Sequence, residues 1–261
     1  MSDSSPVYEL RIAETEDDIR DAQRLRYQVF VEELGGDGVD VDHENRLERD
    51  EFDDWFDHLI LYDRSRPEGD QAVGAYRVMR DDQAAKLGRY YTDAEYDLTA
   101  LKTCGRKLLE LGRSCVHRDY RGGSALPQLW VGLMNYSDAH GIDVMFGVAS
   151  FHGTDLDAIK LPLSHLHHSH LAPPELRTRV LDEFYTSADL MPADEIDDKA
   201  AMKAMPALIK AYLRLNGVIG DGVYIDEPFN TSDVCIIVDM AKVPPKQRAM
   251  YEKLAKREAK G

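Results

Sequence analysis

The chain has 261 residues, of which 43% are hydrophobic and 31% charged, a composition typical of a soluble globular protein. Its formal net charge of −16 argues against nucleic acid as a partner, because the average field repels phosphates. No apolar run reaches the ~18 residues that a membrane span needs. The N-terminal residues are polar and lack the apolar segment of a secretory signal peptide. Three scattered cysteines are too few for a disulfide framework or a zinc site. We therefore expect a cytoplasmic protein.

The first third of the chain predicts a strand, a helix and a hairpin. Residues 7–13 alternate in hydropathy as a strand does. Thr15 and Asp18 have the spacing of a capping box, which predicts that a helix begins there. The runs 57–63 and 72–80 have strand character and flank a turn-rich segment, so they predict a β-hairpin.

The middle of the chain predicts a strand, a turn, a helix and a second strand. Residues 108–117 have strand character, with Gly112 as a predicted bulge or point of close approach. A glycine turn follows at 121–124, and the helix after it ends at Gly141. Residues 143–150 then predict a buried strand.

The rest of the chain predicts an irregular insertion at about 152–200, a helix at 206–215 and final strands at 218–225 and 233–240. This order predicts an α+β fold, with a mixed central sheet flanked by helices. We assign one domain to residues 1–240 and a basic tail to 241–261.

Charge is unevenly distributed along the sequence. Residues 37–57 contain ten acidic residues against two arginines, and residues 241–261 contain seven Lys or Arg against two Glu. The acidic segment is suited to a cationic group, and the basic tail to an anionic surface such as the inner membrane. Two solvated surfaces are the alternative interpretation of such runs.

Four groups of charged residues then follow in a distinctive order. They are Arg26 in LRYQVF, the E-x-D-x-x-D spacing of Glu48, Asp50 and Asp53, Arg77 in GAYRVM, and the E-x-x-R pair of Glu110 and Arg113. This order resembles the acyl-homoserine-lactone autoinducer synthases, which have a GNAT-like fold.

A longer set of segments resembles more strongly the N-acyltransferases that make lyso-ornithine lipid. The segments include RYQVFVEELG, ERDEFDDWFDHLILYD, LELGRSCVHRDYR, FGVASFHG and LSHLHHSHLAPPELR. The resemblance covers roughly residues 25–240. It implies a GNAT-like fold and transfer of a 3-hydroxy fatty acyl group from acyl carrier protein to the α-amine of L-ornithine. It also implies that the phosphopantetheine arrives on the donor, so no cofactor of the enzyme's own is expected.

The reaction needs a neutral amine and support for an oxyanion. Glu110 is the candidate general base, and Arg113 is suited to orient it or to hold a carboxylate. Backbone N–H groups near Gly112 and Ser114 are candidates to bind the oxyanion, as the bulged strand does in GNAT enzymes. The alternative is an ion pair between Glu110 and Arg113 that ties the sheet together.

The acceptor amino acid carries an ammonium group and a carboxylate. Glu48, Asp50 and Asp53 are candidates to hold the ammonium group through charge-assisted hydrogen bonds, with Arg26 nearby. Arg77 is a candidate to grip the carboxylate bidentately. The same three acids are equally suited to cap loops or to pair with Arg26 and Arg77.

The glycine turn departs from the GNAT phosphate loop R/Q-x-x-G-x-G/A, because Ser124 and Leu126 replace its two glycine positions. A helix N-terminus still binds an anion, but the departure disfavours the pyrophosphate of coenzyme A. It favours the single phosphodiester of a carrier protein. The candidate donor contacts are Ser114, Arg118, Arg121, Gly122 and Gly123. Surface arginines without a role are the alternative for Arg118 and Arg121.

Four histidines at 165, 167, 168 and 170 lie in the segment expected to be irregular, without the spacing of a known zinc site. We predict ordinary hydrogen-bonded histidines and no metal site.

Three alternatives stay open. The same machinery is suited to glutamine or another amino acid, because acceptor choice rests on a few pocket side chains. An autoinducer synthase acting on S-adenosylmethionine is the second. The third is a non-catalytic module that binds a carrier protein or a membrane.

Overall fold

The computed structural model describes residues 6–38 and 40–258. They form two units. Unit 1 comprises Met1–Ala84, Leu111–Gly141 and Ala249–Gly261, and unit 2 comprises Ala85–Glu110 and Ile142–Arg248. The expected α+β architecture, with parallel and antiparallel strands and flanking helices, is confirmed. The division at residue 240 stays a prediction.

Unit 1 is built around strands β1, β2 and β3. Its elements are β1 (Tyr8–Ile12), α1 (Glu16–Arg26), the π-helix η1 (Tyr27–Glu33), β2 (Asp57–Asp63), β3 (Ala72–Arg80), the second part of β5 (Leu108–Val116), η3 (Arg118–Tyr120), α4 (Ala125–His140) and most of α8 (Pro245–Glu258). The predicted hairpin is confirmed, because β2 pairs antiparallel with β3. β1 pairs with the other edge of β2.

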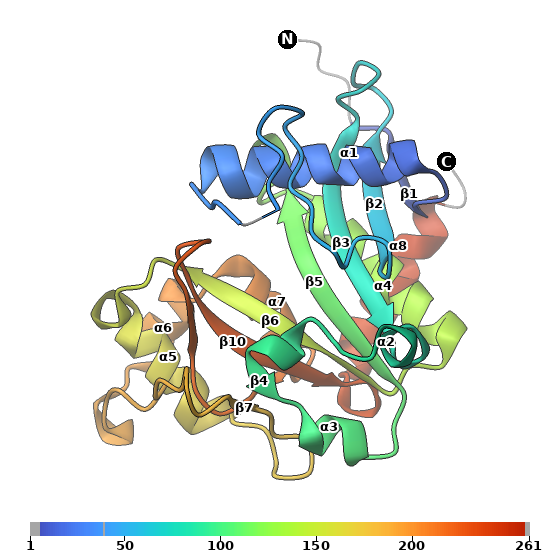
Figure 1. Cartoon of the computed structure of the whole chain (residues 1–261). Helices are drawn as coiled ribbons and strands as arrows, with labels where there is room; N and C mark the ends of the chain where they lie inside the picture. The colour runs from blue at the N-terminus through green and yellow to red at the C-terminus, as the bar shows by residue number, and fades with distance from the viewer. Residues whose placement is uncertain (1–5, 39, 259–261) are drawn as a thin grey trace. The chain divides into compact units, whose positions relative to one another are not determined.

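Helices α1 and α4 cover opposite faces of these strands (Figure 1). Because side chains alternate along a strand, Ile60 and Tyr62 point to one face, where they pack with Leu25 of α1. Leu59 points to the other face and lies so close to α4 that a Cβ atom on Gly132 would approach its Cδ2 to 2.7 Å. Glycine at 132 therefore permits close packing of α4 on the sheet.

Both predicted helix boundaries are confirmed. The Thr15 side chain accepts the Asp18 N–H, and the Asp18 carboxylate accepts the Thr15 N–H, which completes the capping box of α1. Helix α4 ends at Gly141, whose φ of 64° lies in the left-handed region that glycine adopts without strain.

Unit 2 contains the antiparallel pair of β6 and β10, to which β8 and β9 add. Its elements are η2 (Thr92–Ala94), β4 (Tyr96–Asp97), α3 (Thr99–Thr103), β6 (Val144–His152), α5 (Leu156–His170), β7 (Arg179–Val180), η4 (Ala193–Glu195), α6 (Asp198–Ala204), α7 (Ala207–Arg214), β8 (Val218–Ile219), β9 (Tyr224–Asp226), β10 (Thr231–Asp239) and η5 (Met240–Lys242). The first three residues of β5 pair parallel with β6. Helix α2 (Asp81–Leu87) begins in unit 1 and ends in unit 2.

The prediction of an irregular segment at 152–200 is wrong for its first part, which forms α5. Asp155 caps the helix by accepting the Asp157 N–H. Pro162 lies inside the helix and costs ~3 kcal/mol there. Burial of Leu163 and Leu166 with the proline ring offsets that cost, and residue-by-residue patterns do not reveal such packing.

The predicted strand at 218–225 is also wrong, because the chain forms two short strands with a turn between them. Gly222 has a φ of 90°, and a Cβ atom on Gly220 would approach the Thr178 Oγ1 atom to 2.1 Å. The turn allows Asp221 to bridge to Arg179 in a separate segment. The two glycines therefore permit a sharp turn and a close backbone approach.

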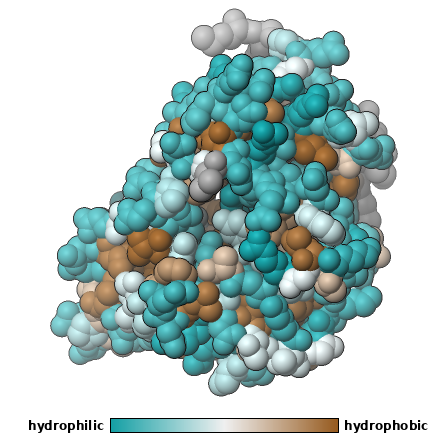
Figure 2. Space-filling model, viewed as in Figure 1, coloured by the Kyte–Doolittle hydropathy of each residue, from teal (hydrophilic) through white to brown (hydrophobic). Residues whose placement is uncertain are grey.

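The visible face of the molecule in Figure 2 is mainly hydrophilic, which agrees with the high charge of the chain. All three cysteines are free thiols. Among the described residues, no helix combines the length and the apolar character needed to cross a membrane.

Candidate active site

Arg26, near the end of α1, is fully buried in unit 1 and is paired with two carboxylates. Its Nη1 and Nη2 atoms donate to the two carboxylate oxygens of Asp53 at 2.7 and 2.8 Å. Its Nε atom donates to Glu48, and Nη2 also donates to the Glu48 carbonyl. A buried guanidinium is tolerated only when it is neutralised and hydrogen-bonded in this way.

Arg77, on β3, is the second buried arginine of unit 1 and is 1% exposed. Its Nη1 donates to Asp53 at 2.7 Å and to Asp50, and its Nη2 donates to the second oxygen of Asp50 at 2.9 Å. The guanidinium carbon lies 4.7 Å from the centre of the Phe56 ring, within range of a cation–π contact. Asp50 and Asp53 are thereby fixed to the sheet.

Arg113, on β5, completes the network. Its Nε atom donates to Glu48 at 3.0 Å and its Nη2 atom to Asp50 at 3.1 Å. Its φ is 47°, a left-handed value that costs of the order of 1–3 kcal/mol for a non-glycine residue. The strand irregularity predicted at Gly112 thus lies at the next residue.

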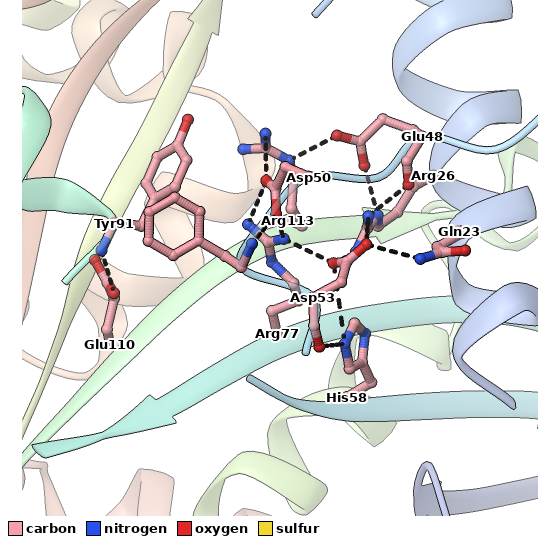
Figure 3. A network of polar contacts seen from close by, with 11 residues as sticks. Gln23, Arg26, Glu48, Asp50, Asp53, His58, Arg77, Tyr91, Glu110 and Arg113 are labelled. Carbon is pink, nitrogen blue, oxygen red and sulfur yellow. Dashed lines mark hydrogen bonds and ion pairs between the residues drawn. The ribbon is translucent and has the colours of Figure 1, made fainter. Parts of the chain in front are cut away.

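The six charged side chains form one network of three arginines and three carboxylates (Figure 3). Gln23 donates to Asp53 at 2.8 Å, and the His58 Nε2–H donates to the Asp53 carbonyl at 2.9 Å. Sequence reasoning missed Gln23 and His58, because neither has a motif of its own. Their contacts hold the loop that carries Asp53.

The pKa values of the network favour the charged forms. Burial by itself raises the pKa of the Asp53 carboxyl, but Arg26 and Arg77 outweigh burial and hold that pKa far below its usual range. The pKa values of Glu48 and Asp50 are lowered for the same reason, with Arg26 the main cation for Glu48 and Arg77 for Asp50. Burial, together with the charge of Arg26, lowers the pKa of His58 and so favours its neutral form.

The structure therefore places all five residues predicted to bind the acceptor in one network, and Arg113 joins them. The open alternative that the E-x-D-x-x-D acids pair with Arg26 and Arg77 is what the structure shows. Access to solvent differs within the network. The side chains of Asp50 and Arg113 are 13% and 14% exposed, whereas those of Arg26, Glu48 and Arg77 are 1% exposed.

Asp50 also lines a hollow of about 690 Å³ at the surface of unit 1. The hollow is mainly acidic. Its walls are formed by Asp40, Val41, Asp42, His43, Glu44, Arg49, Asp50 and Glu51. This is the acidic segment of the sequence folded around one open space. It is suited to a cationic group, because several carboxylates lie near it and few basic groups compensate them.

Glu110 is the third residue of β5 and is 1% exposed in unit 2. Its two carboxylate oxygens accept the backbone N–H groups of Tyr91 and Thr92, at 2.9 and 2.7 Å. These two N–H groups begin η2, so Glu110 caps that turn. No sequence signal indicated this contact, because Tyr91 and Thr92 precede Glu110 by 19 and 18 residues.

The predicted glycine turn and the helix after it are confirmed. Gly122 has a φ of 76°, and the N-cap Ser124 of α4 makes no side-chain capping bond. Arg121 donates to the Val116 carbonyl at 3.0 Å and to Glu33, whose pKa the Arg121 hydrogen bond lowers. The side chain of Arg118 is 63% exposed and lies 3.9 Å from Glu33.

A surface hollow of about 820 Å³ adjoins this turn. Gly123 and Ser124 line it together with Arg121, Arg66 and Tyr120. Ser114 lies on β5 beside Arg113. That these residues contact a donor stays a prediction.

Comparison with known proteins identifies the family of the chain. The sequence model of the acetyltransferase (GNAT) domain matches residues 25–131, a segment that contains every residue predicted for the site. The chain is 55% identical over 246 residues to an L-ornithine N(alpha)-acyltransferase of Rhodobacter capsulatus, covering 94% of each chain. The chain belongs to the L-ornithine N(alpha)-acyltransferase family.

A second relative of this family and one solved structure are also similar to the chain. An L-ornithine N(alpha)-acyltransferase of Brucella abortus is 43% identical over 247 residues, which cover 93% of this chain and 88% of the relative. Among solved structures, FeeM, an N-acyl amino acid synthase from uncultured soil microbes, aligns with a TM-score of 0.47 and 12% identity over 94% of this chain and 95% of that one. The curated relatives and the matched domain model show that the chain is an acyltransferase with a GNAT domain, as the resemblance in its sequence implied.

Proposed function

We propose that this acyltransferase transfers a 3-hydroxy fatty acyl group from an acyl carrier protein thioester to the α-amine of L-ornithine. The products are N-acyl-ornithine, which is lyso-ornithine lipid, and the free carrier protein thiol. The observation that carries the proposal is the 55% identity, over 94% of both chains, to a relative named for the acylation of ornithine.

The chemistry requires the loss of two protons from nitrogen, the gain of one proton by sulfur and the exchange of a C–S bond for a C–N bond. The α-ammonium group loses a proton, and the neutral amine attacks the thioester carbon to form a tetrahedral oxyanion. The C–S bond breaks when this oxyanion collapses and expels the thiolate. The amine nitrogen releases a second proton, and the thiolate takes one up. Glu110 is the proposed base, acting directly or through water. Backbone N–H groups near Gly112 and Ser114 are proposed to bind the oxyanion.

The burial of the network refines the proposed acceptor contacts. Arg26, Arg77, Glu48 and Asp53 are enclosed and bonded to one another, so we assign them to positioning. Arg113 has the most accessible guanidinium of the three arginines, and we assign it the acceptor carboxylate. Asp50 and the acidic hollow beside it receive the side-chain ammonium group of ornithine.

The proposed donor is a carrier protein, because the turn at 121–126 lacks the glycine positions of a coenzyme A phosphate loop. Arg118 is 63% exposed, and its Nε atom lies 3.9 Å from Glu33, so we propose that it contacts the phosphodiester. Arg121 is held more tightly, because it hydrogen-bonds to Glu33. The phosphopantetheine belongs to the donor, and no cofactor of the enzyme is included in the proposal.

Peripheral contact with the inner membrane is part of the same proposal, because the product is a lipid. Helix α8 presents exposed Lys246 and Lys253 and the exposed apolar side chain of Met250. Tyr251, however, stacks on Trp130 of α4 with ring centres 6.3 Å apart. The buried side of α8 therefore attaches the helix to unit 1, and basic side chains on its other side are proposed to meet anionic lipid.

The test uses purified full-length protein with 3-hydroxypalmitoyl carrier protein and, separately, 3-hydroxypalmitoyl coenzyme A. Each donor is offered ornithine, glutamine, lysine or S-adenosylmethionine, and thiol release is followed together with the mass of the product. Fastest release with ornithine and carrier protein supports the proposal. A clear preference for glutamine or S-adenosylmethionine overturns the acceptor, and faster turnover with coenzyme A overturns the donor.

A further inference from the structure

Two histidines near the C-terminal end of α5 face an aspartate that follows them by about twenty residues in unit 2. His168 Nε2 lies 3.0 Å from Asp189 Oδ1, and His167 Nε2 lies 4.0 Å from Asp189 Oδ2. One ligand atom from each of the three residues lies within 4.8 Å of the other two. These residues belong neither to the acidic network nor to the donor turn.

The sequence predicted no metal site here, because the segment was expected to be irregular and its histidines lack the spacing of a known zinc site. The structure adds two facts. The histidines lie on α5, which fixes their backbone, and the third ligand, Asp189, comes from a loop about twenty residues later. That loop is held against α5, because the Leu190 N–H donates to Ser164 Oγ at 3.1 Å. Asp189 is therefore anchored beside the histidines by its neighbour.

The Nε2 atoms of both histidines lie near the Asp189 carboxylate. His167 Nδ1 is buried, so Nε2 is the nitrogen that faces Asp189. His168 Nε2 faces both Asp189 and the Met191 carbonyl, each at 3.0 Å. A metal ion at this point would replace the proton of His168 Nε2 and would add attraction for the carboxylate.

We propose that His167, His168 and Asp189 bind one Zn²⁺ ion, with water as the fourth ligand. Imidazole nitrogen and carboxylate oxygen are both common zinc ligands. Zinc–ligand bonds of about 2.0–2.2 Å place ligand atoms roughly 3.3 Å apart in a tetrahedral site, so only small side-chain rotations are needed. The ion fastens the loop of Asp189 to α5, and it takes no part in the acyl transfer.

The chain provides a matched control on the same helix. His165 Nδ1 lies 3.0 Å from Asp198 Oδ1, a histidine–aspartate pair of the same length as that of His168 and Asp189. Among the described residues, no third ligand completes a metal group there. Asp198→Asn therefore removes one carboxylate from the same region and leaves the proposed site intact.

The experiment uses the full-length chain without a polyhistidine tag, first stripped with a chelator. Zn²⁺ is titrated by equilibrium dialysis, bound metal is counted by elemental analysis, and Co²⁺ replaces it for visible spectroscopy. We expect one bound equivalent and a tetrahedral Co²⁺ spectrum in the parent and in Asp198→Asn. In both Asp189→Asn and His168→Gln we expect affinity lower by at least about tenfold.

Circular dichroism of each metal-free variant shows whether the fold is retained, and the exposed position of Asp189 favours this. If one variant fails to fold, the other still decides the proposal. Equal Zn²⁺ affinity in the parent, Asp189→Asn and His168→Gln would identify an adventitious ion only. That result, or the absence of saturable binding in the parent, overturns the proposal.

Discussion

Arg113 reaches Asp50 with an Nη2 to Oδ2 distance of 3.1 Å from a backbone position whose φ is 47°. The left-handed conformation turns the strand at the point where the Arg113 side chain enters the network of arginines and carboxylates. Arg77 holds the same carboxylate from β3. Asp50 is thus held by two guanidinium groups, and it also lines the acidic hollow.

Replacement of Glu110 by glutamine tests the proposed base. We expect turnover to fall by about 10²-fold or more, because an amide cannot accept the proton. Donor binding should stay nearly unchanged. The measurement is kcat and the KM for each substrate across pH. Near-normal turnover at every pH would show that Glu110 only caps the turn at Tyr91 and Thr92.

A melting curve is the control for Glu110→Gln. The amide NH₂ group would face one of the two backbone N–H groups that now bind the carboxylate. A loss of that hydrogen bond lowers stability by about 1–3 kcal/mol. Assays are therefore made well below the midpoint of unfolding, so that lost turnover is separated from lost structure.

Arg77→Ala tests positioning against direct binding. Because Asp50 and Asp53 would lose a buried partner, we expect the free energy of unfolding to fall by about 3–5 kcal/mol. Urea unfolding measures this loss. An unchanged stability with a raised KM for the acceptor alone would instead support the carboxylate grip predicted from the sequence.

Arg113→Lys is the matched change at the accessible edge of the network. It keeps the charge beside Glu48 and Asp50 but removes the planar fork that binds a carboxylate with two hydrogen bonds. We expect the acceptor KM to rise by about tenfold, with the donor KM and the stability little changed. A rise in the donor KM of the same size would contradict the assignment.

Glu44→Gln tests the acidic hollow. Glu44 is an exposed part of its wall, and its attraction for a nearby ammonium group is worth roughly 1 kcal/mol in water. The KM for ornithine should rise several-fold, whereas that for glutamine should not, since its side chain is neutral. Glu16→Gln, an exposed residue at the start of α1, is the control and should change neither value.

Acid should destabilise the fold through carboxyls whose pKa values are lowered. The Asp53 and Asp18 pKa values are depressed, for Asp53 mainly by Arg26 and Arg77 acting against burial, and for Asp18 mainly by its hydrogen bonds with Arg11. The unfolded chain therefore binds more protons, and stability present at neutral pH is lost as pH falls below about 4.

Urea unfolding between pH 6 and pH 3 measures that loss. Asp18→Asn removes one carboxyl with a lowered pKa and leaves the buried network unchanged. The free energy of unfolding of this variant should therefore vary less steeply with pH than that of the parent protein. A parallel dependence in the two proteins would assign the acid sensitivity elsewhere.

Reversal of the charge on α8 tests the proposed membrane contact. We expect the double variant Lys246→Glu and Lys253→Glu to lose sedimentation with anionic vesicles, because each surface cation contributes about 1 kcal/mol there. Turnover with soluble carrier protein should be unchanged. Lys246 and Lys253 are exposed, so their replacement preserves the stacking of Tyr251 on Trp130. Truncation of the tail would remove that stacking.

Neutral vesicles and raised salt are the controls, since both weaken electrostatic binding. Lost turnover without a change in vesicle binding would point to carrier recognition. If neither quantity changes, the basic tail is a solvated helix with no part in the function.

The sequence by itself determined what depends on neighbouring residues. The capping box of Thr15 and Asp18, the helix end at Gly141 and the hairpin of 57–63 and 72–80 each rest on short-range spacing, and each was confirmed. The motifs and their order along the chain also identified the family, because both can be compared with relatives without knowledge of the fold.

Only the tertiary structure decided which charges meet. Arg26, Arg77 and Arg113 come from a helix and two strands, and their convergence on three loop carboxylates depends on sheet register and long-range packing. Arg26, Arg77 and the three acids, which the sequence suggested as substrate contacts, instead pair with one another, because a buried charge must be neutralised. Long-range packing also explains why helix α5 continues past Pro162. The burial of its apolar side chains outweighs the free-energy cost of a proline inside a helix, and only that cost is visible in the sequence.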